Sequence, residues 1–320
     1  MSPLDWHRSS GLVVVSKLVD TKSSDDHAVL RLAFNRCPKL RREPITAALD
    51  ARRVGVQTAL TLDYLAAAAP AYLTSTQQAK ATPDWLDNAI RYAVEPVQGA
   101  ASCLIPVAAG MGKTAGYLTA DYLHQTARTL RRTEAVPDPV WQALVTHHHP
   151  QDGQQLGDNA ERRGKIDQAI AFYSGVEGEI PNWNVAGRLA DLLAEQGEVQ
   201  ELRQQGAGNH FAAMRLADLL AGQGEVQELR QRAAAGDRSA AVRLADLLAE
   251  QGEAQEAIAV LRQPTDAGDW YAAEQLIALL AEQGRIDDLE LEVRAGTHGA
   301  AARLARIRRS AGNAEAKKSI

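Results

Sequence analysis

Apolar residues recur at helical spacing through the second half of the chain. Within residues 237–252, small and large apolar side chains fall at i, i+3, i+4 and i+7, namely Ala241, Leu244, Ala245 and Leu248. This spacing places them on one face of an α-helix. Asp237 can cap the start of that helix, and Gly252 can end it with a positive φ. Residues 255–263 then continue as a second helix, so the pattern predicts a helical hairpin.

The same unit recurs along the chain. RLADLLAEQGE begins at Arg188 and again at Arg243, and RLADLLAGQGE begins at Arg215. Degenerate copies begin at Gln155, Gln275 and Arg303, and the shared glycine falls at positions 164, 197, 224, 252, 284 and 312. One hairpin cannot bury its apolar stripe alone, whereas stacked neighbours can. A long coiled coil is the alternative, but glycines interrupt every unit.

These repeats resemble the tetratricopeptide-repeat family. The first copy matches best, with its family residues at Leu156-Gly157, Ala160, Ala169, Tyr173 and Pro181. Several units are shorter than the family's pattern of about 34 residues. The resemblance implies a solenoid of stacked hairpins, in which the first helix of each unit lines a groove for a partner.

Helical patterns also dominate the first half. They cover residues 27–35, 44–53, 58–69, 83–92, 115–132 and 137–149, while residues 9–20 read as one strand. We therefore predict an all-α fold in three parts. A helical module spans 1–146, with a short strand near 12–19. The tetratricopeptide-like solenoid spans 150–312, and 313–320 forms a flexible tail.

Three strings of the first half, 49–77, 83–100 and 115–125, carry a second resemblance. They are similar to the region that follows the NTPase domain in actinobacterial STAND-type, NACHT-like ATPases with C-terminal helical repeats. The NTPase core itself would precede residue 44. The resemblance implies that this chain is the sensor half of such an NTPase, which acts in trans or has been lost.

VAAGMGKT, at residues 107–114, ends like a phosphate-binding loop. The glycine that opens such a loop is replaced by Val107, and Pro106 interrupts the strand that would feed it. Helical patterns follow, without the strand whose carboxylate would hold Mg²⁺. We therefore expect Lys113 to be a solvated residue in the first turn of a helix and predict no nucleotide cofactor. An autonomous NTPase is the least favoured function.

Other candidate sites are weaker. Residues 47–64 have a helix-turn-helix cadence, but the would-be recognition helix, TALTLDYL, has an acid and no base, so a winged-helix-like structural remnant is favoured over DNA binding. His147–His149 lack the partners of a metal site, and Cys37 and Cys103 form no disulfide or metal spacing. The 320 residues carry a net charge of −5. Neither half is basic enough to bind nucleic acid, and no segment could span a membrane.

Function is expected on the repeats. Core positions repeat faithfully whereas the exposed face of each first helix varies. The predicted partner-binding residues are Asp191, Glu195, Phe211, Asp218, Asp246, Glu250 and Tyr271. Alternatively, the aspartates only pair with Arg188, Arg215 and Arg243 on their own helices. We predict a cytoplasmic, non-catalytic scaffold, without cofactor or metal, that binds a protein or peptide with basic and apolar residues. The sequence does not define its oligomeric state.

Overall fold

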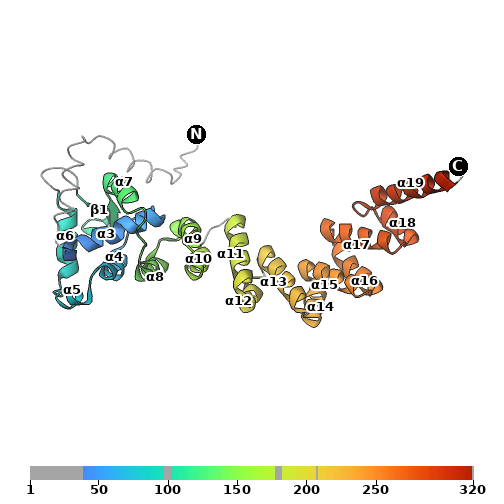
Figure 1. Ribbon diagram of the computed structural model, residues 1–320, viewed down its shortest axis with the longest axis horizontal. Coiled ribbons are helices and arrows are strands. Elements are labelled where there is room, and N and C mark those ends of the chain that lie inside the picture. Colours follow the sequence, from blue (N-terminus) through green and yellow to red (C-terminus); the bar gives the residue numbers. More distant parts are fainter. Residues whose placement is uncertain (1–38, 97–101, 177–181, 207, 319–320) are drawn as a thin grey trace, which may run out of the picture. The chain divides into compact units, whose positions relative to one another are not determined.

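The computed structural model describes residues 39–96, 102–176, 182–206 and 208–318. This part of the chain is mostly helical, as the all-α prediction requires (Figure 1). It divides into two compact units, Met1–Ile180 and Pro181–Ile320. The strand predicted near residues 12–19 and the helix predicted at 27–35 lie outside the described residues, as does Cys37.

The first unit contains helices and one β-hairpin. Its elements are α3 (Lys39–Val54), α4 (Leu62–Ala68), η1 (Ala69–Tyr72), α5 (Ser75–Ala79), α6 (Trp85–Val94), β1 (Leu104–Gly110), β2 (Lys113–Thr119), α7 (Asp121–Leu130), α8 (Asp138–His147), η2 (Pro150–Asp152), α9 (Gly153–Glu161) and α10 (Ile166–Ser174). Helix α3 packs against α4, α6 and α7 and so forms the centre of the unit. Tyr64, Trp141 and Phe172 are among its largest fully buried side chains.

A third extended segment joins the hairpin. Strands β1 and β2 pair antiparallel, and Leu60 bridges to Tyr117 on β2 through backbone hydrogen bonds of 2.8 and 2.9 Å. Gly116 lies against this bridge, where a Cβ would stand 2.6 Å from the Leu60 carbonyl oxygen. Along the chain the order is α3, the Leu60 bridge, α4, η1, α5, α6 and the β1–β2 hairpin.

The first repeat copy belongs to this unit. Asp152, which is 3% exposed, accepts hydrogen bonds from the backbone N–H groups of Gln57 and Thr58 at 2.9 and 3.2 Å. The Thr58 hydroxyl donates to it at 2.6 Å. These bonds hold the start of the α9–α10 hairpin on the loop after α3. The boundary between the two compact units lies at 180/181, so the first repeat copy falls in the first unit.

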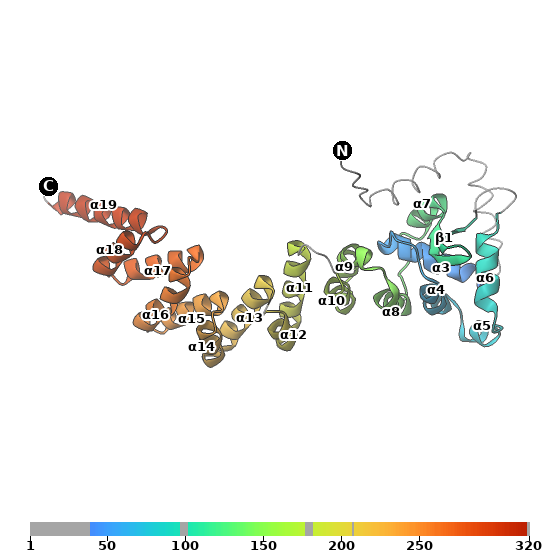
Figure 2. The same ribbon diagram turned by 180° about the vertical axis from the view of Figure 1, so that it is seen from behind.

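The second unit consists of helices joined by short turns. They are α11 (Trp183–Gln196), α12 (Val199–Gln205), α13 (His210–Gln223), α14 (Val226–Ala234), α15 (Arg238–Glu250), α16 (Ala254–Asp266), α17 (Trp270–Glu282), α18 (Ile286–Ala295) and α19 (Ala300–Lys318). Each helix packs against the next along the chain. The first helices of successive hairpins, α11, α13, α15, α17 and α19, also pack against one another (Figures 1 and 2).

The cap predicted at Asp237 is confirmed, and equivalent caps occur in three other units. The side chains of Asn182, Asn209, Asp237 and Asp269 accept hydrogen bonds from backbone N–H groups in the first turns of α11, α13, α15 and α17. Gly252 has a φ of 82° just after α15, as expected for a residue that ends a helix. The predicted tail at 313–320 overlaps α19, which continues through Gly312 to Lys318. Alanine and lysine favour the helix there and offset the cost of one glycine, about 1 kcal/mol.

Candidate partner-binding face

Four positions of each first helix share one face. Counted from the cap, these are the second, sixth, ninth and thirteenth, which lie within about 60° of one another at 100° per residue. We call this face the polar stripe. It consists of Asn184, Arg188, Asp191 and Glu195 on α11; Phe211, Arg215, Asp218 and Gly222 on α13; Ser239, Arg243, Asp246 and Glu250 on α15; Tyr271, Gln275, Ala278 and Glu282 on α17; and Arg303, Arg306 and Ser310 on α19.

The predicted aspartates are linked by arginines from neighbouring helices. Arg215 lies between Asp191 at 2.7 Å and Asp218 at 3.3 Å. Arg243 lies between Asp218 at 2.6 Å and Asp246 at 3.2 Å. In each case the shorter contact reaches the preceding first helix, whereas the longer one stays on the same helix. We call this series the Arg–Asp ladder.

The ladder changes the role expected of these carboxylates. Asp191 contacts Arg188 at 3.4 Å as well as Arg215, and Asp218 contacts both Arg215 and Arg243. Pairing within one helix, the alternative expected from the sequence, therefore occurs, but its contacts are longer than those between helices. Two arginines neutralise each of these aspartates, so they do not form an open row of negative charge.

Asp246 differs from the other two. Among the described residues it forms one ion pair, with Arg243, and its side chain is 39% exposed, against 27% for Asp191 and 28% for Asp218. Burial raises the pKa of the Asp246 carboxyl, with Glu250 adding to the shift while Arg243 opposes it. Glu195 and Glu250 are exposed at the thirteenth position. The available negative charge thus gathers at Asp246 and Glu250.

The two aromatic residues of the site have different surroundings. Phe211 is half-buried, because its ring covers Gly187 and lies 6.3 Å from the Trp183 ring and 6.0 Å from the His210 ring. Tyr271 is 42% exposed and lies 5.8 Å from the Trp270 ring.

Two tryptophans at the variable first position after a cap lie outside the set of predicted site residues. Trp183 is 59% exposed and Trp270 is 62% exposed, at the first positions of α11 and α17. The available signal was a large aromatic residue just after a cap, outside the apolar core positions. Both border the polar stripe and are better exposed than Phe211.

VAAGMGKT forms the end of the β-hairpin. Gly110 and Gly112 have φ values of 139° and 71°, and the fully exposed Met111 lies between them. Lys113 and Thr114 begin strand β2, so the prediction that Lys113 lies in a helix is wrong, as is one helix over 115–132. The two positive-φ glycines make a tight reversal of the backbone, which is incompatible with an α-helix. In this geometry the loop does not lead into the helix N-terminus that cradles phosphate in nucleotide sites.

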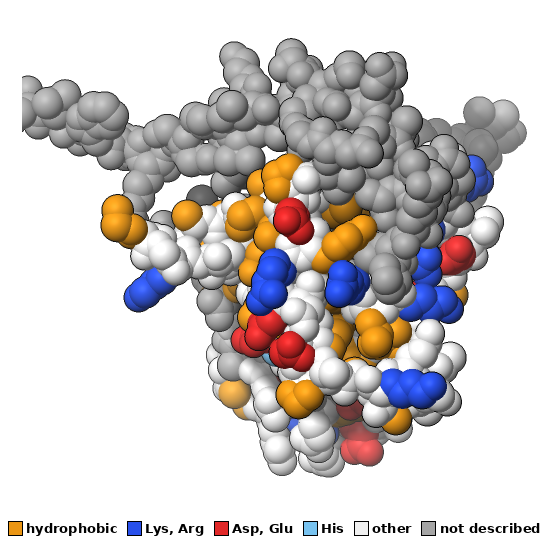
Figure 3. Space-filling view, turned by 90° about the vertical axis from the view of Figure 1, so that its left-hand side faces the viewer, with side chains coloured by type: hydrophobic (Ala, Val, Ile, Leu, Met, Phe, Trp, Pro, Cys, Tyr) orange, Lys and Arg blue, Asp and Glu red, His pale blue; other side chains and the backbone are white. Residues whose placement is uncertain are grey.

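The helix-turn-helix prediction is also corrected. Residues 47–64 do not form such a pair, because α3 ends at Val54 and α4 begins at Leu62. Helix α6 exposes Asp87 and Arg91, and its N-cap residue Asp84 is also exposed. On the face with α5 and α6, the visible described side chains intermix positive, negative and apolar groups (Figure 3).

The histidine run joins the repeat-like hairpin to the rest of its unit. Helix α8 ends at His147, and the His148 ring stands edge-on to Phe172 at 5.1 Å. Among the residues that the structure describes, no group of three or more His, Cys, Asp or Glu side chains could hold a metal ion. No described helix is both long and apolar enough to cross a membrane.

Comparison with known proteins adds no identification. No protein-family model matches the chain, and no curated protein matches it. The structural class is that of a mostly helical protein with repeated hairpins, and its function has to be inferred from the polar stripe.

Proposed function

We propose that this protein is a non-catalytic scaffold that binds a segment of a partner protein on its polar stripe. The observation that carries the proposal is the contrast between the buried core positions and the exposed polar stripe of the first helices. Core positions of the first helices are repeatedly Ala and Leu. On the stripe, by contrast, the second position differs on each of α11, α13, α15 and α17, and α17 and α19 lack the ninth-position aspartate of the other three helices. A repeated core with a varied face suits a stack whose surface recognises an extended or helical ligand.

The arrangement we propose is a tetratricopeptide-like solenoid in the cytoplasm. Support comes from the packing of each first helix on the next first helix, which is the packing of stacked hairpins. The Arg–Asp ladder adds a second link between the same helices. The partner's apolar side chains would contact Tyr271 and Trp270, since exposed aromatics tend to contribute most of the binding free energy at interfaces.

A selection from a random peptide library displayed on phage tests this function. Purified full-length protein should recover peptides that bind with micromolar affinity or better. Tyr271→Ala and Trp270→Ala should each weaken that binding at least five-fold, because both remove exposed aromatic surface beside the stripe.

Leu291→Ala provides the matched control. Leu291 is 55% exposed but lies on α18, a second helix, so its loss should change the affinity less than two-fold. Recovery of no binding peptide, or equal losses in all three variants, would contradict the proposed function.

A second candidate function is the sensor half of a STAND-type NTPase, acting with an NTPase domain in trans. The observation that favours it is that residues of all three resembled strings pack into one unit around α3. A pull-down between the purified protein and an NTPase domain encoded beside its gene tests this candidate. Nucleotide-dependent retention of that domain would support it, and no retention with or without ATP would oppose it.

A further inference from the structure

The Arg–Asp ladder stops at α17. The sixth and ninth positions of this helix are Gln275 and Ala278, so α17 contributes neither an arginine to Asp246 nor an aspartate to α19. Helix α19 resumes with Arg303 at the sixth position but has Arg306 where α11, α13 and α15 have aspartate. Along the stripe, two carboxylates on α15 are therefore followed by one carboxylate, Glu282, on α17 and by two arginines on α19.

The negative part of the stripe consists of Asp246 and Glu250 on α15. Asp246 retains one arginine contact, at 3.2 Å, instead of two, and it is the most exposed aspartate of the ladder. Glu250 is exposed one helical turn further along the same face. These two carboxylates can accept charged hydrogen bonds from a ligand without losing a second arginine.

The positive part of the stripe, on α19, lines a cavity on the same face. This cavity has a volume of about 210 Å³ and is lined by Ala281, Glu282, Arg303, Arg306, Ile307 and Ser310. Among the described side chains, none forms an ion pair with Arg303 or Arg306. Two guanidinium groups face one carboxylate there, so the cavity keeps a positive excess that favours an acidic group.

The surrounding charges reinforce this polarity. Residues 182–299 contain 10 arginines and 20 Asp or Glu, whereas residues 300–318 contain six Lys or Arg and one Glu. The long-range field of the second unit therefore changes sign near α19. A ligand with opposite charges at its two ends would be steered into one orientation.

We propose that the stripe from α15 to α19 binds an extended segment of a partner protein with a basic residue at one end and an acidic residue at the other. The basic residue lies at Asp246 and Glu250, and the acidic residue lies at Arg303 and Arg306. Tyr271, on α17, provides an apolar contact between them. Packed helices lie about 8–10 Å apart, so the two charged ends are on the order of 20 Å apart. About six residues of extended chain cover that distance.

This inference rests on the proposed function and specifies the charge pattern of the partner. It is tested with full-length protein and four fluorescent 12-residue peptides on a common Gly/Ser/Leu background. Two carry a Lys pair and a Glu pair six residues apart, in opposite orders; one carries only the Lys pair, and one only the Glu pair. Fluorescence anisotropy should show that one mixed order binds at least ten-fold tighter than either single-charge peptide.

Charge reversal on α19 locates the acidic end. Arg306→Glu should weaken the preferred mixed peptide at least ten-fold and should create affinity for a peptide with Lys pairs at both ends. Arg309→Glu makes the same charge change on the same helix, outside the stripe, and should alter binding less than two-fold. An unfolded protein would not gain affinity for the peptide with two Lys pairs, so this gain shows that Arg306→Glu is folded.

Equal binding of the mixed and single-charge peptides would overturn the proposal, as would equal effects of the two reversals. If library-selected peptides lose affinity in Tyr271→Ala but not in Arg306→Glu, the proposed function stands and this charge pattern is wrong. Failure of both variants to affect the selected peptides would instead count against the proposed function itself.

Discussion

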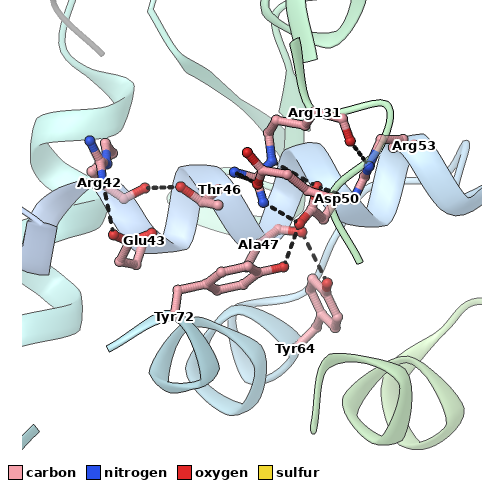
Figure 4. Close-up of polar contacts among 10 residues, drawn as sticks. Arg42, Glu43, Thr46, Ala47, Asp50, Arg53, Tyr64, Tyr72 and Arg131 are labelled. Atoms are coloured by element: carbon pink, nitrogen blue, oxygen red, sulfur yellow. Dashed lines mark hydrogen bonds and ion pairs between the residues drawn. The ribbon is translucent and has the colours of Figure 1, made fainter. Parts of the chain in front are cut away.

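Arginine–aspartate pairs occur in both units, but in opposite environments. In the first unit, Asp50 on α3 is 0% exposed and receives two hydrogen bonds from Arg131, at 2.8 and 3.1 Å (Figure 4). In the second unit, Asp218 is 28% exposed and lies between Arg215 and Arg243. The same ionic chemistry therefore acts once inside a core and once along a surface.

The buried pair belongs to a wider network. The Tyr72 hydroxyl donates to Asp50 at 2.8 Å, and a guanidinium nitrogen of Arg53 approaches it to 3.1 Å without hydrogen-bond geometry. Arg53 also donates to the backbone carbonyl of Arg131. These contacts join α3, η1 and the turn after α7, as Figure 4 shows. Loss of the central carboxylate would remove the ion-pair partner of the buried Arg53 and would leave Arg131 with Glu134, at 2.7 Å, alone.

The comparison indicates which pairs stabilise the fold and which shape a surface. Breaking a buried pair by removing one partner costs about 3–5 kcal/mol, because the remaining charge stays buried. Exposed pairs contribute roughly 0.2–1 kcal/mol, because water can replace the lost partner. The first unit should therefore depend on its network for stability, whereas the second can vary its ladder to alter the charges that a partner meets.

Replacement of Asp50 should have the largest effect on stability. Asp50→Asn should lower the free energy of unfolding of the first unit by about 3–5 kcal/mol. The matched change Asp218→Asn should cost less than about 1 kcal/mol. Hydrogen–deuterium exchange of peptides from α3 and α13 measures the two units separately. Similar losses of protection in both variants would remove the distinction between the buried and exposed pairs.

Removal of the Tyr72 hydroxyl should have the next largest effect. Tyr72→Phe leaves one bond of the Asp50 carboxylate unmade, which costs about 1.5–3 kcal/mol for a charged acceptor. Thermal unfolding at pH 7 measures this loss. Tyr173→Phe is the matched control, since its hydroxyl donates at 2.7 Å to Asp158, which is half-buried, whereas Asp50 is fully buried. A control loss as large as that of Tyr72→Phe would contradict the role of burial.

Two tyrosines near Asp50, Tyr64 and Tyr72, predict that the first unit loses stability at alkaline pH. Burial raises the pKa of Tyr64 and of Tyr72, and the Asp50 carboxylate adds to both shifts. The unfolded chain releases these protons near the ordinary tyrosine pKa of about 10, while the folded chain keeps them. The free energy of unfolding should thus fall as the pH rises above about 10. Denaturation in urea between pH 8 and 11 measures the slope, which should be shallower in Tyr72→Phe.

The repeat half was more predictable than the first half. Its caps, its helical stripes and the glycine after α15 depend on local contacts, which sequence spacing records. Partners such as Arg215 and Asp191 were not predictable in the same way, since they meet only when two hairpins stack. The local alternative, pairing three residues apart, gave the right residues but missed their shorter contacts across helices.

The first half held two features that local patterns could not reveal. Residues 102–119 have few apolar alternations, and Pro106 argues against a central strand; yet β1 is an edge strand, where proline is tolerated. The Asp50 network was not predicted either, because Tyr72 and Arg131 are 22 and 81 residues from Asp50 in the sequence. Its only local signal was an acid among the apolar residues of α3.

A double-mutant cycle on Asp191 and Arg215 should give a smaller effect than any change at Asp50. The contact across α11 and α13 should show a coupling of about 0.2–1 kcal/mol in denaturant unfolding, as exposed pairs do. This coupling should shrink in 1 M NaCl, where the Debye length is about 3 Å. A salt-independent coupling of several kcal/mol would mean that the ladder, like the Asp50 network, stabilises the fold from a desolvated site.

The smallest expected effect concerns Lys113, at the exposed end of the β-hairpin. Lys113→Ala removes a side chain that forms no ion pair with a described residue, so the free energy of unfolding should change by less than about 0.5 kcal/mol. The wild type should bind neither ATP nor GTP at millimolar concentration with Mg²⁺, because a β-strand, instead of a helix N-terminus, follows Gly112. Equilibrium dialysis with both nucleotides checks this, and Arg91→Ala on α6 serves as an exposed basic control. Micromolar nucleotide binding that Lys113→Ala abolishes, while Arg91→Ala retains it, would show that the hairpin rearranges into a phosphate-binding loop.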